Sequence, residues 1–305
     1  MPDDHGHIPV LLHEVLTHLA PRPGDTVLDL TLGRGGHAEA LARSALPDGE
    51  LIGLDADADN AAYARSRLEA TGVQSRVIHD NFVRVADVME DLDRQADVVL
   101  ADLGLASTQL ALADRGFSFS TEGPLDMRLN TAGHVTGADL INAMPEQELA
   151  DLIQRVGEEP LGRQIAAKIA QERRRGPILT TGQLRELVVQ VYGTRARSSR
   201  RHPATRTFMA LRIAVNDELA ALDTLLARIE AASTGTAWLA PGARVGIIAF
   251  HSLEDRRVKQ CFARLAAREL VRLPSRSAIR PGEEELARNS RARSARLRTM
   301  ELPGH

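Results

Sequence analysis

The sequence predicts an α/β protein whose parallel sheet is interrupted by an inserted all-helical domain. Strand-like and helix-like patterns alternate over the first hundred residues, and the next strand-like pattern then comes only at residue 244. Alternation of this kind builds parallel strands joined by right-handed crossovers. Because a crossover needs only about a dozen residues, most of the long interval must fold as a structure of its own.

The first half contains the alternating elements. Short apolar runs bounded by turn residues are typical of buried strands, and the longer amphipathic stretches between them are typical of helices. In chain order we expect strand 26–30, helix 37–43, strand 50–54, helix 59–70, strand 75–79 and strand 96–101.

Polar residues follow each of these strands at the point where it ends. The first strand leads from Asp29 to Gly36, and the others are followed by Asp55, Asp80 and Asp102. Ligands of parallel sheets bind outside the carboxyl ends of the strands. The alternative is that each acid caps the helix after it. An acid at the end of each of four successive strands favours a ligand site.

The patterns in the second half of the sequence predict the inserted domain and a further strand of the sheet. Apolar residues spaced three and four apart predict one long amphipathic helix over 206–232, which crosses into a strand at 244–250. A helix at 253–267 and a tail rich in proline, arginine and serine follow. The intervening helical patterns lie at 138–143, 146–156, 161–174 and 183–191, the last preceded by a capping box of Thr180 and Gln183. The expected domains are 1–112 and 205–305, around an inserted helical domain at 113–204.

Composition excludes several classes of protein. With 43% apolar and 26% charged residues among 305, the chain is globular and not disordered. No apolar run approaches the roughly 18–20 residues that span a bilayer, and the acidic N-terminus lacks the pattern of a secretory signal. The single cysteine, Cys261, excludes an internal disulfide, and the early histidines 5, 7, 13 and 18 lack metal-site spacing. We therefore expect a cytoplasmic protein with no metal and no membrane contact.

Charge is unevenly distributed along the chain, although the net charge is only −3. Residues 1–102 carry 19 acidic and 8 basic side chains, whereas residues 103–305 carry 22 acidic and 30 basic ones. Apart from Lys168 and Lys259 the cations are arginines, whose planar fork suits phosphates and bases. This asymmetry indicates a polyanionic partner.

The glycine cluster after the first strand predicts a nucleotide-type cofactor. Gly33, Gly35 and Gly36 allow the backbone to approach a ligand closely, and Asp55 comes 19 residues after Gly36, where a carboxylate can accept ribose hydroxyls. The loop lacks the third glycine that admits a dinucleotide pyrophosphate. Asp29 would repel a pyrophosphate and attract an ammonium group. S-adenosylmethionine is therefore favoured over NAD, and a turn without a ligand is the remaining alternative.

The end of the fourth strand predicts the acceptor side of a methyl transfer. Asp102 can accept a hydrogen bond from an amine and orient its lone pair, and displacement at a methyl relies on positioning and proton removal. Methylation of C5 in a pyrimidine needs a nucleophile, and Cys261 lies in the middle of an expected helix. An exocyclic nitrogen or an oxygen therefore fits better as the acceptor.

The motifs of this chain resemble those of the bacterial 16S ribosomal RNA cytosine-N4-methyltransferases (the RsmH or MraW family). The resemblance runs in order from His7 to Arg298. It implies a Rossmann-like methyltransferase sheet with an inserted substrate domain, S-adenosylmethionine as cofactor, and transfer to N4 of a cytidine in the decoding centre of the small (30S) subunit. The motifs are HIPVLLHEVL, DLTLGRGGHA, ADLG-x-x-S-x-QL, RGFSF with GPLDMRL, HPATRTF-x-A-x-RI-x-VN-x-EL, FHSLEDR and RARSARLR.

The resemblance also implies roles for individual residues. Catalytic roles fall to Asp102, Ser107 and His251, with Ser252, Glu254 and Asp255 of the histidine motif near the acceptor. The cofactor contacts are Gly33, Gly35, Gly36, His37, Asp55, Phe82, Asp102 and Gln109.

Arginines beside the inserted domain are the expected RNA contacts. The alternative for each one is an ordinary solvated surface. Phe117 and Phe119 are candidate flat partners for a flipped base, with two core phenylalanines as the alternative. The expected RNA-binding residues are Arg195, Arg197, Arg200, Arg201 and Arg206.

Three positions depart from the family pattern. Leu105 and Ala106 replace the usual residues after DLG, where the family commonly has a serine at the second position, and Ala111 stands where an acid is usual. These departures keep two alternatives open: a diverged paralogue acting on another RNA, and an assembly factor that binds cofactor and RNA with little catalysis. The sequence leaves the oligomeric state open, a homodimer included.

Overall fold

The computed structural model describes residues 9–104, 109, 112–198, 202–235 and 238–304. The chain divides into two compact units. We call Met1–Gly104 with Leu219–His305 the sheet unit, and Leu105–Glu218 the helical unit. The helical unit is longer at both ends than the sequence-based range 113–204. At its C-terminal end the reason is that the helix after residue 204 packs into the core of this unit.

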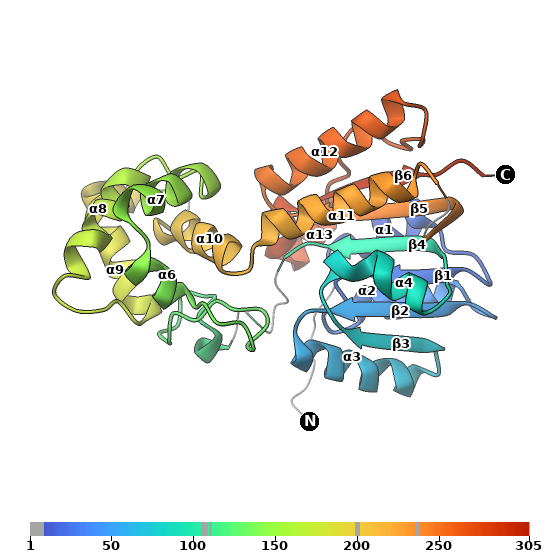
Figure 1. Cartoon of the computed structure of the whole chain (residues 1–305), viewed down its shortest axis with the longest axis horizontal. Coiled ribbons are helices and arrows are strands. Elements are labelled where there is room, and N and C mark those ends of the chain that lie inside the picture. Colours follow the sequence, from blue (N-terminus) through green and yellow to red (C-terminus); the bar gives the residue numbers. More distant parts are fainter. Residues whose placement is uncertain (1–8, 105–108, 110–111, 199–201, 236–237, 305) are drawn as a thin grey trace. The chain divides into compact units, whose positions relative to one another are not determined.

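A six-stranded sheet forms the centre of the sheet unit, with the strand order β3-β2-β1-β4-β5-β6 (Figure 1). The first five strands are parallel and β6 runs antiparallel to β5. The order reverses between β1 and β4, which is where an open α/β sheet binds ligands. The strands are β1 (Thr26–Asp29), β2 (Glu50–Asp55), β3 (Ser75–His79), β4 (Ala96–Asp102), β5 (Leu239–Ala249) and β6 (Arg296–Glu301).

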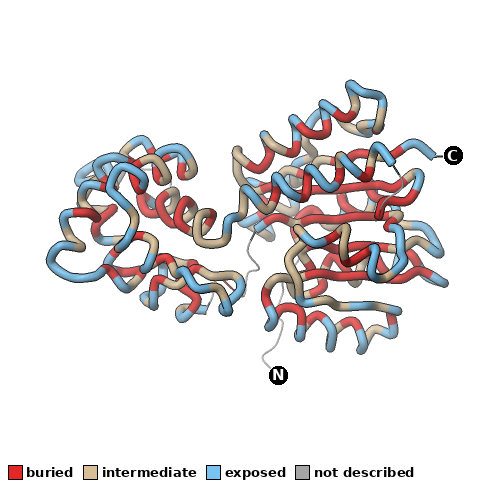
Figure 2. Tube along the Cα trace, in the orientation of Figure 1, coloured by how far each residue is buried: buried red, intermediate tan, exposed pale blue. Residues whose placement is uncertain are grey.

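Helices cover both faces of this sheet. Buried side chains of α4, α11 and α12 pack on one face, and those of α1, α2 and α3 pack on the other. The inner strands β1, β2, β4 and β5 are buried along most of their length, whereas the edge strand β3 has no fully buried residue (Figure 2). The helices of this unit are α1 (Leu12–Leu19), α2 (Gly36–Ser44), α3 (Ala58–Thr71), α4 (Val85–Asp91), α11 (Glu218–Ala232), α12 (Ser252–Ala267) and α13 (Glu283–Arg288).

The helical unit has its own hydrophobic core of leucine, isoleucine, valine and phenylalanine side chains. The expected capping box is present, because the Thr180 hydroxyl accepts from the Gln183 N–H and the Gln183 side chain accepts from the Thr180 N–H. A π-helical turn at Leu152–Val156 extends helix α7 (Glu146–Asp151). The helices are α6 (Gly137–Ala143), α7 (Glu146–Asp151), α8 (Gly162–Glu172), α9 (Thr181–Tyr192) and α10 (Ala204–Val215).

The prediction of one long helix over 206–232 is wrong, since α10 ends at Val215 and α11 begins at Glu218. Asn216 explains the break, because its side-chain oxygen accepts from the Leu129 N–H at 2.7 Å and its amide donates to the Met127 carbonyl at 2.7 Å. Asp217 then takes a positive φ of 50°. Tertiary hydrogen bonds thus end a helix that the apolar spacing alone would continue.

The C-terminal tail also differs from expectation, because it returns to the sheet as β6. Arg296 and Arg298 of this strand donate to the Asp255 carboxylate at 2.9 and 2.7 Å. This shared carboxylate offsets part of the positive charge of the two arginines in the strand that completes the sheet. Within the described residues, no helix combines the length and the apolar character needed to cross a bilayer.

Candidate active site at the carboxyl edge of the sheet

The glycine loop between β1 and α2 is held by the segment just before α1. A Cβ on Gly36 would lie 2.7 Å from Cγ of Pro9, so any larger residue would displace that proline. Gly33 and Gly35 have positive φ values of 52° and 78°, which L-residues with side chains rarely adopt. The glycines therefore serve the loop's own backbone geometry as well as any ligand.

His37, the second residue of α2, is fixed at the same place. Its Nε2 donates to the Val10 carbonyl at 2.8 Å, and its side chain is 7% exposed. Because Nε2 holds a proton, Nδ1 carries the lone pair when the ring is neutral. Nδ1 lies 3.6 Å from Oδ2 of Asp102, so the ring links the N-terminal segment to the end of β4.

Asp29 and Asp55 end the two strands that flank the glycine loop. Asp29 is 1% exposed, and burial raises its pKa to about 7 against one hydrogen bond from the Thr31 N–H. Burial raises the pKa of Asp55 to about 6, although its oxygens accept from the N–H groups of Gly33 and Asp57 at 2.7 and 2.8 Å. Both carboxyls thus keep their protons to a higher pH than an ordinary aspartate does.

Asp55 does not cap the helix that follows it. Asp57 does, because its side chain accepts from the N–H groups of Asp59 and Asn60. Asp80, after β3, lies 3.8 Å from the Arg84 guanidinium. The capping alternative therefore fails for Asp55, whose carboxylate instead accepts from the Gly33 N–H and so orders the glycine loop.

Asp102 ends β4, the strand beside β1 at the reversal of the sheet. Its backbone N–H donates to the Thr31 hydroxyl at 2.5 Å. Its Oδ1 is buried and has no hydrogen-bond partner among the residues that the structure describes. Burial raises the pKa of Asp102 well above its usual range, and the charges of Asp29 and Glu254 raise it further. A buried carboxylate oxygen at the carboxyl edge of a sheet that lacks a partner among the described residues is a place for an additional hydrogen-bond donor.

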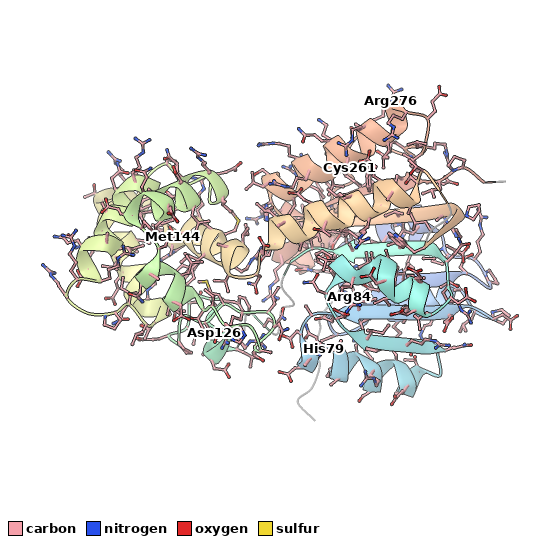
Figure 3. The ribbon with its side chains drawn as sticks, in the orientation of Figure 1. His79, Arg84, Asp126, Met144, Cys261 and Arg276 are labelled. Atoms are coloured by element: carbon pink, nitrogen blue, oxygen red, sulfur yellow. The ribbon has the colours of Figure 1, made fainter. Side chains whose placement is uncertain are left out.

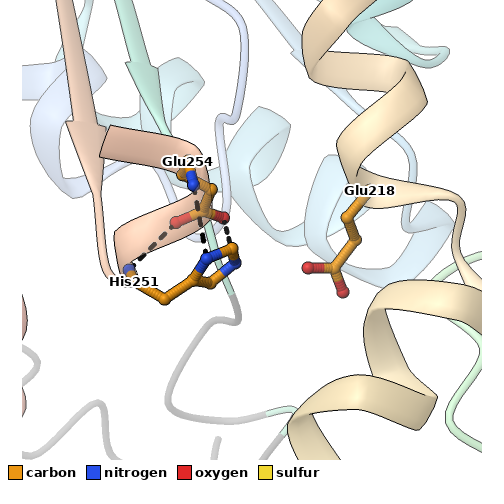
Figure 4. A group of neighbouring side chains, drawn as sticks. All are labelled: Glu218, His251 and Glu254. Atoms are coloured by element: carbon orange, nitrogen blue, oxygen red, sulfur yellow. Dashed lines mark hydrogen bonds and ion pairs between the residues drawn. The ribbon is translucent and has the colours of Figure 1, made fainter. Parts of the chain in front are cut away.

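His251 and Glu254 form a reciprocal cap at the start of α12, as Figure 4 shows. The Glu254 N–H donates to Nδ1 of His251 at 3.3 Å, and Oε2 of Glu254 accepts from the N–H groups of Phe250 and His251. Nε2 then lies 3.1 Å from Oε1 of the same carboxylate. Glu218, drawn in the same view, begins α11 and is ion-paired with Arg212 at 2.7 Å. The histidine motif therefore shapes the end of β5.

Cys261 lies on α12 in Figure 3 and is 2% exposed. Burial raises the pKa of its thiol to about 11, and Sγ contacts the Leu226 carbonyl at 3.9 Å. A buried thiol that resists ionisation is not a nucleophile. This agrees with the exclusion of C5 methylation.

Other expected contacts have varied surroundings. Phe82 is half-buried in a 3-10 turn after β3, and Gln109 is 4% exposed in the helical unit. Ser107, Ala106 and Ala111 lie outside the described residues.

The expected RNA-binding arginines belong to the helical unit. Arg195 is exposed in a 3-10 turn, Gly193–Ser198, and Arg206 is half-buried on α10. Of Arg197 the structure describes the backbone alone, and Arg200 and Arg201 lie outside the described residues. Phe117 is 6% exposed and belongs to the core, whereas Phe119 is half-buried.

Most arginines of the C-terminal region have partners in the fold. Arg264 and Arg268 reach Glu230 at 2.6 and 2.7 Å, and Arg257 reaches Asp223 at 3.0 Å. These pairs link α12 to α11. Part of the arginine excess is therefore structural.

A parallel sheet that reverses beside a glycine loop, with carboxylates at the ends of its central strands, defines a Rossmann-like enzyme that binds a nucleotide-type cofactor. A family model described as the MraW methylase family matches residues 4–302. The chain belongs to this family, and the family resemblance in its motifs is confirmed.

Curated relatives match over nearly the whole chain and are named ribosomal RNA small subunit methyltransferase H. The protein from Syntrophobacter fumaroxidans is 42% identical over 314 residues, which cover 98% of this chain and 97% of the relative. That from Thermomicrobium roseum is 44% identical and covers 98% and 94%. That from a Picosynechococcus species is 42% identical and covers 99% and 98%.

Proposed function

We propose that this methylase transfers a methyl group from S-adenosylmethionine to the exocyclic N4 of a cytidine in the decoding centre of 16S rRNA, within the small ribosomal subunit. The names of the relatives support small-subunit ribosomal RNA as the substrate. The methyl-acceptor assignment rests on one observation: Oδ1 of Asp102 is buried and has no hydrogen-bond partner among the described residues. An exocyclic amine is a donor that this oxygen can accept from.

The carboxyl edge of the sheet fits a cationic nucleoside cofactor. Asp29, Asp55 and Asp102 all have raised pKa values because they are buried with little positive charge to offset theirs. S-adenosylmethionine supplies a transferable methyl on a positively charged sulfur, together with an ammonium group and ribose hydroxyls. Asp29 attracts the ammonium, Asp55 accepts the ribose hydroxyls, and the glycine loop lets the backbone approach. Further contacts are assigned to His37, Phe82 and Gln109.

Asp102 acts as the positioning group and as a base in this proposal. Its ionised carboxylate accepts an N–H of the amine, which orients the nitrogen lone pair away from the carboxylate. Once the nitrogen gains a fourth bond it must lose a proton. A carboxylate with a raised pKa takes up that proton more readily than an ordinary aspartate. His37 and the His251–Glu254 pair hold the surrounding backbone, and Ser107 is assigned a further contact to the acceptor.

We assign RNA binding to the helical unit, as a substrate-recognition domain. Its exposed arginines, Arg195 first among them, suit the phosphate backbone. Arg197, Arg200, Arg201 and Arg206 complete the proposed set. The natural setting of such a substrate is the bacterial cytoplasm, and the active form is a monomer or a homodimer.

Nucleoside mass spectrometry tests the proposal directly. Unmethylated small subunits incubated with the protein and S-adenosylmethionine are expected to gain N4-methylcytidine. Binding of S-adenosylmethionine without any new methylated nucleoside would instead support the assembly-factor alternative. Methylation of a different RNA would support the diverged paralogue. Thermal stabilisation by NAD in place of S-adenosylmethionine would overturn the cofactor assignment.

A further inference from the structure

An exposed imidazole in the helical unit has one of its two faces covered. His202, just before α10, is exposed, and its ring stacks on Phe119 with centroids 4.5 Å apart and planes 19° from parallel. Phe119 in turn meets Phe208 edge-on, at 5.3 Å and 75°. Phe208 is 3% exposed, so this stack is anchored in the core of the unit. Since Phe119 covers one face, the exposed surface of the ring lies on its other face and its edge.

The orientation of this ring is fixed by hydrogen bonds as well as by stacking. Nδ1 of His202 accepts from the Ala204 N–H at 3.2 Å, and the His202 carbonyl accepts from the Thr205 N–H at 3.0 Å. These two donors belong to the first turn of α10. A ring that is already ordered loses little further conformational entropy when a ligand packs on it.

The ring of His202 also has a lowered tendency to carry a positive charge. Burial lowers the pKa of His202, and the charge of Arg185 lowers it further. Arg185 is held beside the stack, because its guanidinium donates to the Phe119 carbonyl at 3.2 Å. The neutral form of the imidazole is therefore favoured, while the neighbouring guanidinium supplies the positive charge that a phosphate requires.

We propose that His202 is a stacking platform for one unpaired nucleobase of the RNA substrate, a base other than the target cytidine. This inference rests on the proposed function, because RNA is the partner assigned there. Proteins that bind single-stranded RNA stack its bases on aromatic side chains backed by positive charge, and the stacking tolerates any base. The stack of His202 on Phe119 beside Arg185 has these components. It also gives Phe119 a role that differs from direct contact with a flipped base: Phe119 supports the ring that makes the contact.

Two variants separate stacking from helix capping. His202→Asn keeps an acceptor for the Ala204 N–H but removes the ring. His202→Phe keeps a flat ring but removes the acceptor and any charge. The readout is the dissociation constant for a fluorescently labelled single-stranded oligoribonucleotide with the decoding-centre sequence, and thermal unfolding checks each variant's fold. Stacking predicts that His202→Asn raises the dissociation constant by about 5- to 150-fold, while His202→Phe binds within about twofold of the original protein.

Three results would overturn the inference. Normal binding by His202→Asn with weak binding by His202→Phe would show that the ring acts as a cap. Weak binding by both would assign the contact to the imidazole nitrogens, and normal binding by both would remove His202 from the interface. Should His202→Phe unfold, His202→Tyr replaces it as the ring-bearing variant.

Methylation of small subunits by the unaltered protein keeps the two proposals distinguishable. If the unaltered protein does not methylate them, the proposed function fails. If it methylates them and His202→Asn binds the oligoribonucleotide normally, only the stacking inference fails.

Discussion

Two groups of carboxylates in the sheet unit have opposite environments. Asp29, Asp55 and Asp102 end the central strands and have raised pKa values. Asp255 and Glu230, on the helices that cover the sheet, each bind two arginines and have lowered pKa values. In a chain with 38 lysines and arginines, cations are not scarce. From this contrast we infer that the carboxyl edge binds a cation that comes from outside the chain.

The largest expected effect of breaking this contrast is on catalysis. Asp102→Asn keeps the size of the side chain and removes its charge and its basicity. We expect methyl transfer to small subunits to fall at least about 100-fold, because positioning and proton removal both depend on this group. The midpoint of thermal unfolding should stay at or above that of the original protein. Turnover near the original value would remove Asp102 from the mechanism.

The paired carboxylates predict a loss of stability instead. Asp255→Ala leaves Arg296 and Arg298 without their partner, and the Asp255 side chain is 11% exposed. Removing one member of a buried pair costs about 3–5 kcal/mol, and the partial exposure of Arg296 reduces this to about 2–3 kcal/mol. Chemical denaturation measures the change. An unchanged free energy of unfolding would show that the strand β6 does not need this neutralisation.

Asp29→Asn should act in the opposite direction at high pH. An unfolded aspartate titrates near pH 3.9, whereas Asp29 in the fold titrates near 7. Between these values the folded state holds a proton that the unfolded state has lost, so the contribution of Asp29 to stability declines as pH rises through this range. We expect the variant to be about 2–4 kcal/mol more stable than the original protein at pH 8, because a difference of about three pKa units is worth about 4 kcal/mol, and equal to it at pH 4. Lower stability of the variant at pH 8 would contradict the assignment of a raised pKa.

The smallest expected effect comes from the exposed counterpart of Asp255. Glu230 also binds two arginines, but both are about half-exposed. Glu230→Gln should cost about 0.5 kcal/mol, because solvent screens such pairs. A loss as large as that of Asp255→Ala would show that burial is not what separates the two.

The sequence predicts the first four strands well and the elements after residue 205 less well. Strand 75–79 is confirmed as β3 over the same residues, and the expected strand ends at Asp55 and Asp102 lie within one residue of those observed. A short apolar run predicts a buried strand because its side chains are stabilised by removal from water. Trp238, just before β5, is 3% exposed and belongs to the core of the sheet unit.

The elements that were missed depend on contacts between distant residues. β6 contains two arginines that pair with Asp255 on α12, and the end of α10 depends on the hydrogen bonds of Asn216 to Met127 and Leu129. Pro9 and Val10 belong to the motif HIPVLLHEVL, and they contact Gly36 and His37. The motif by itself does not predict these contacts. Of the site, the acids at the strand ends were predictable. Their raised pKa values and the unpartnered oxygen of Asp102 were not, since these depend on what is absent around them in the described fold.

Calorimetric titration with S-adenosylmethionine tests the central claim most directly. The claim is that the carboxylates at the sheet edge receive a cation, and a cation favours their ionised forms. At pH 6.5, in two buffers with different ionisation enthalpies, binding should therefore release protons, and Asp29→Asn should release fewer. Binding without proton release, or with proton uptake, would contradict the claim that these carboxylates bind a positively charged ligand.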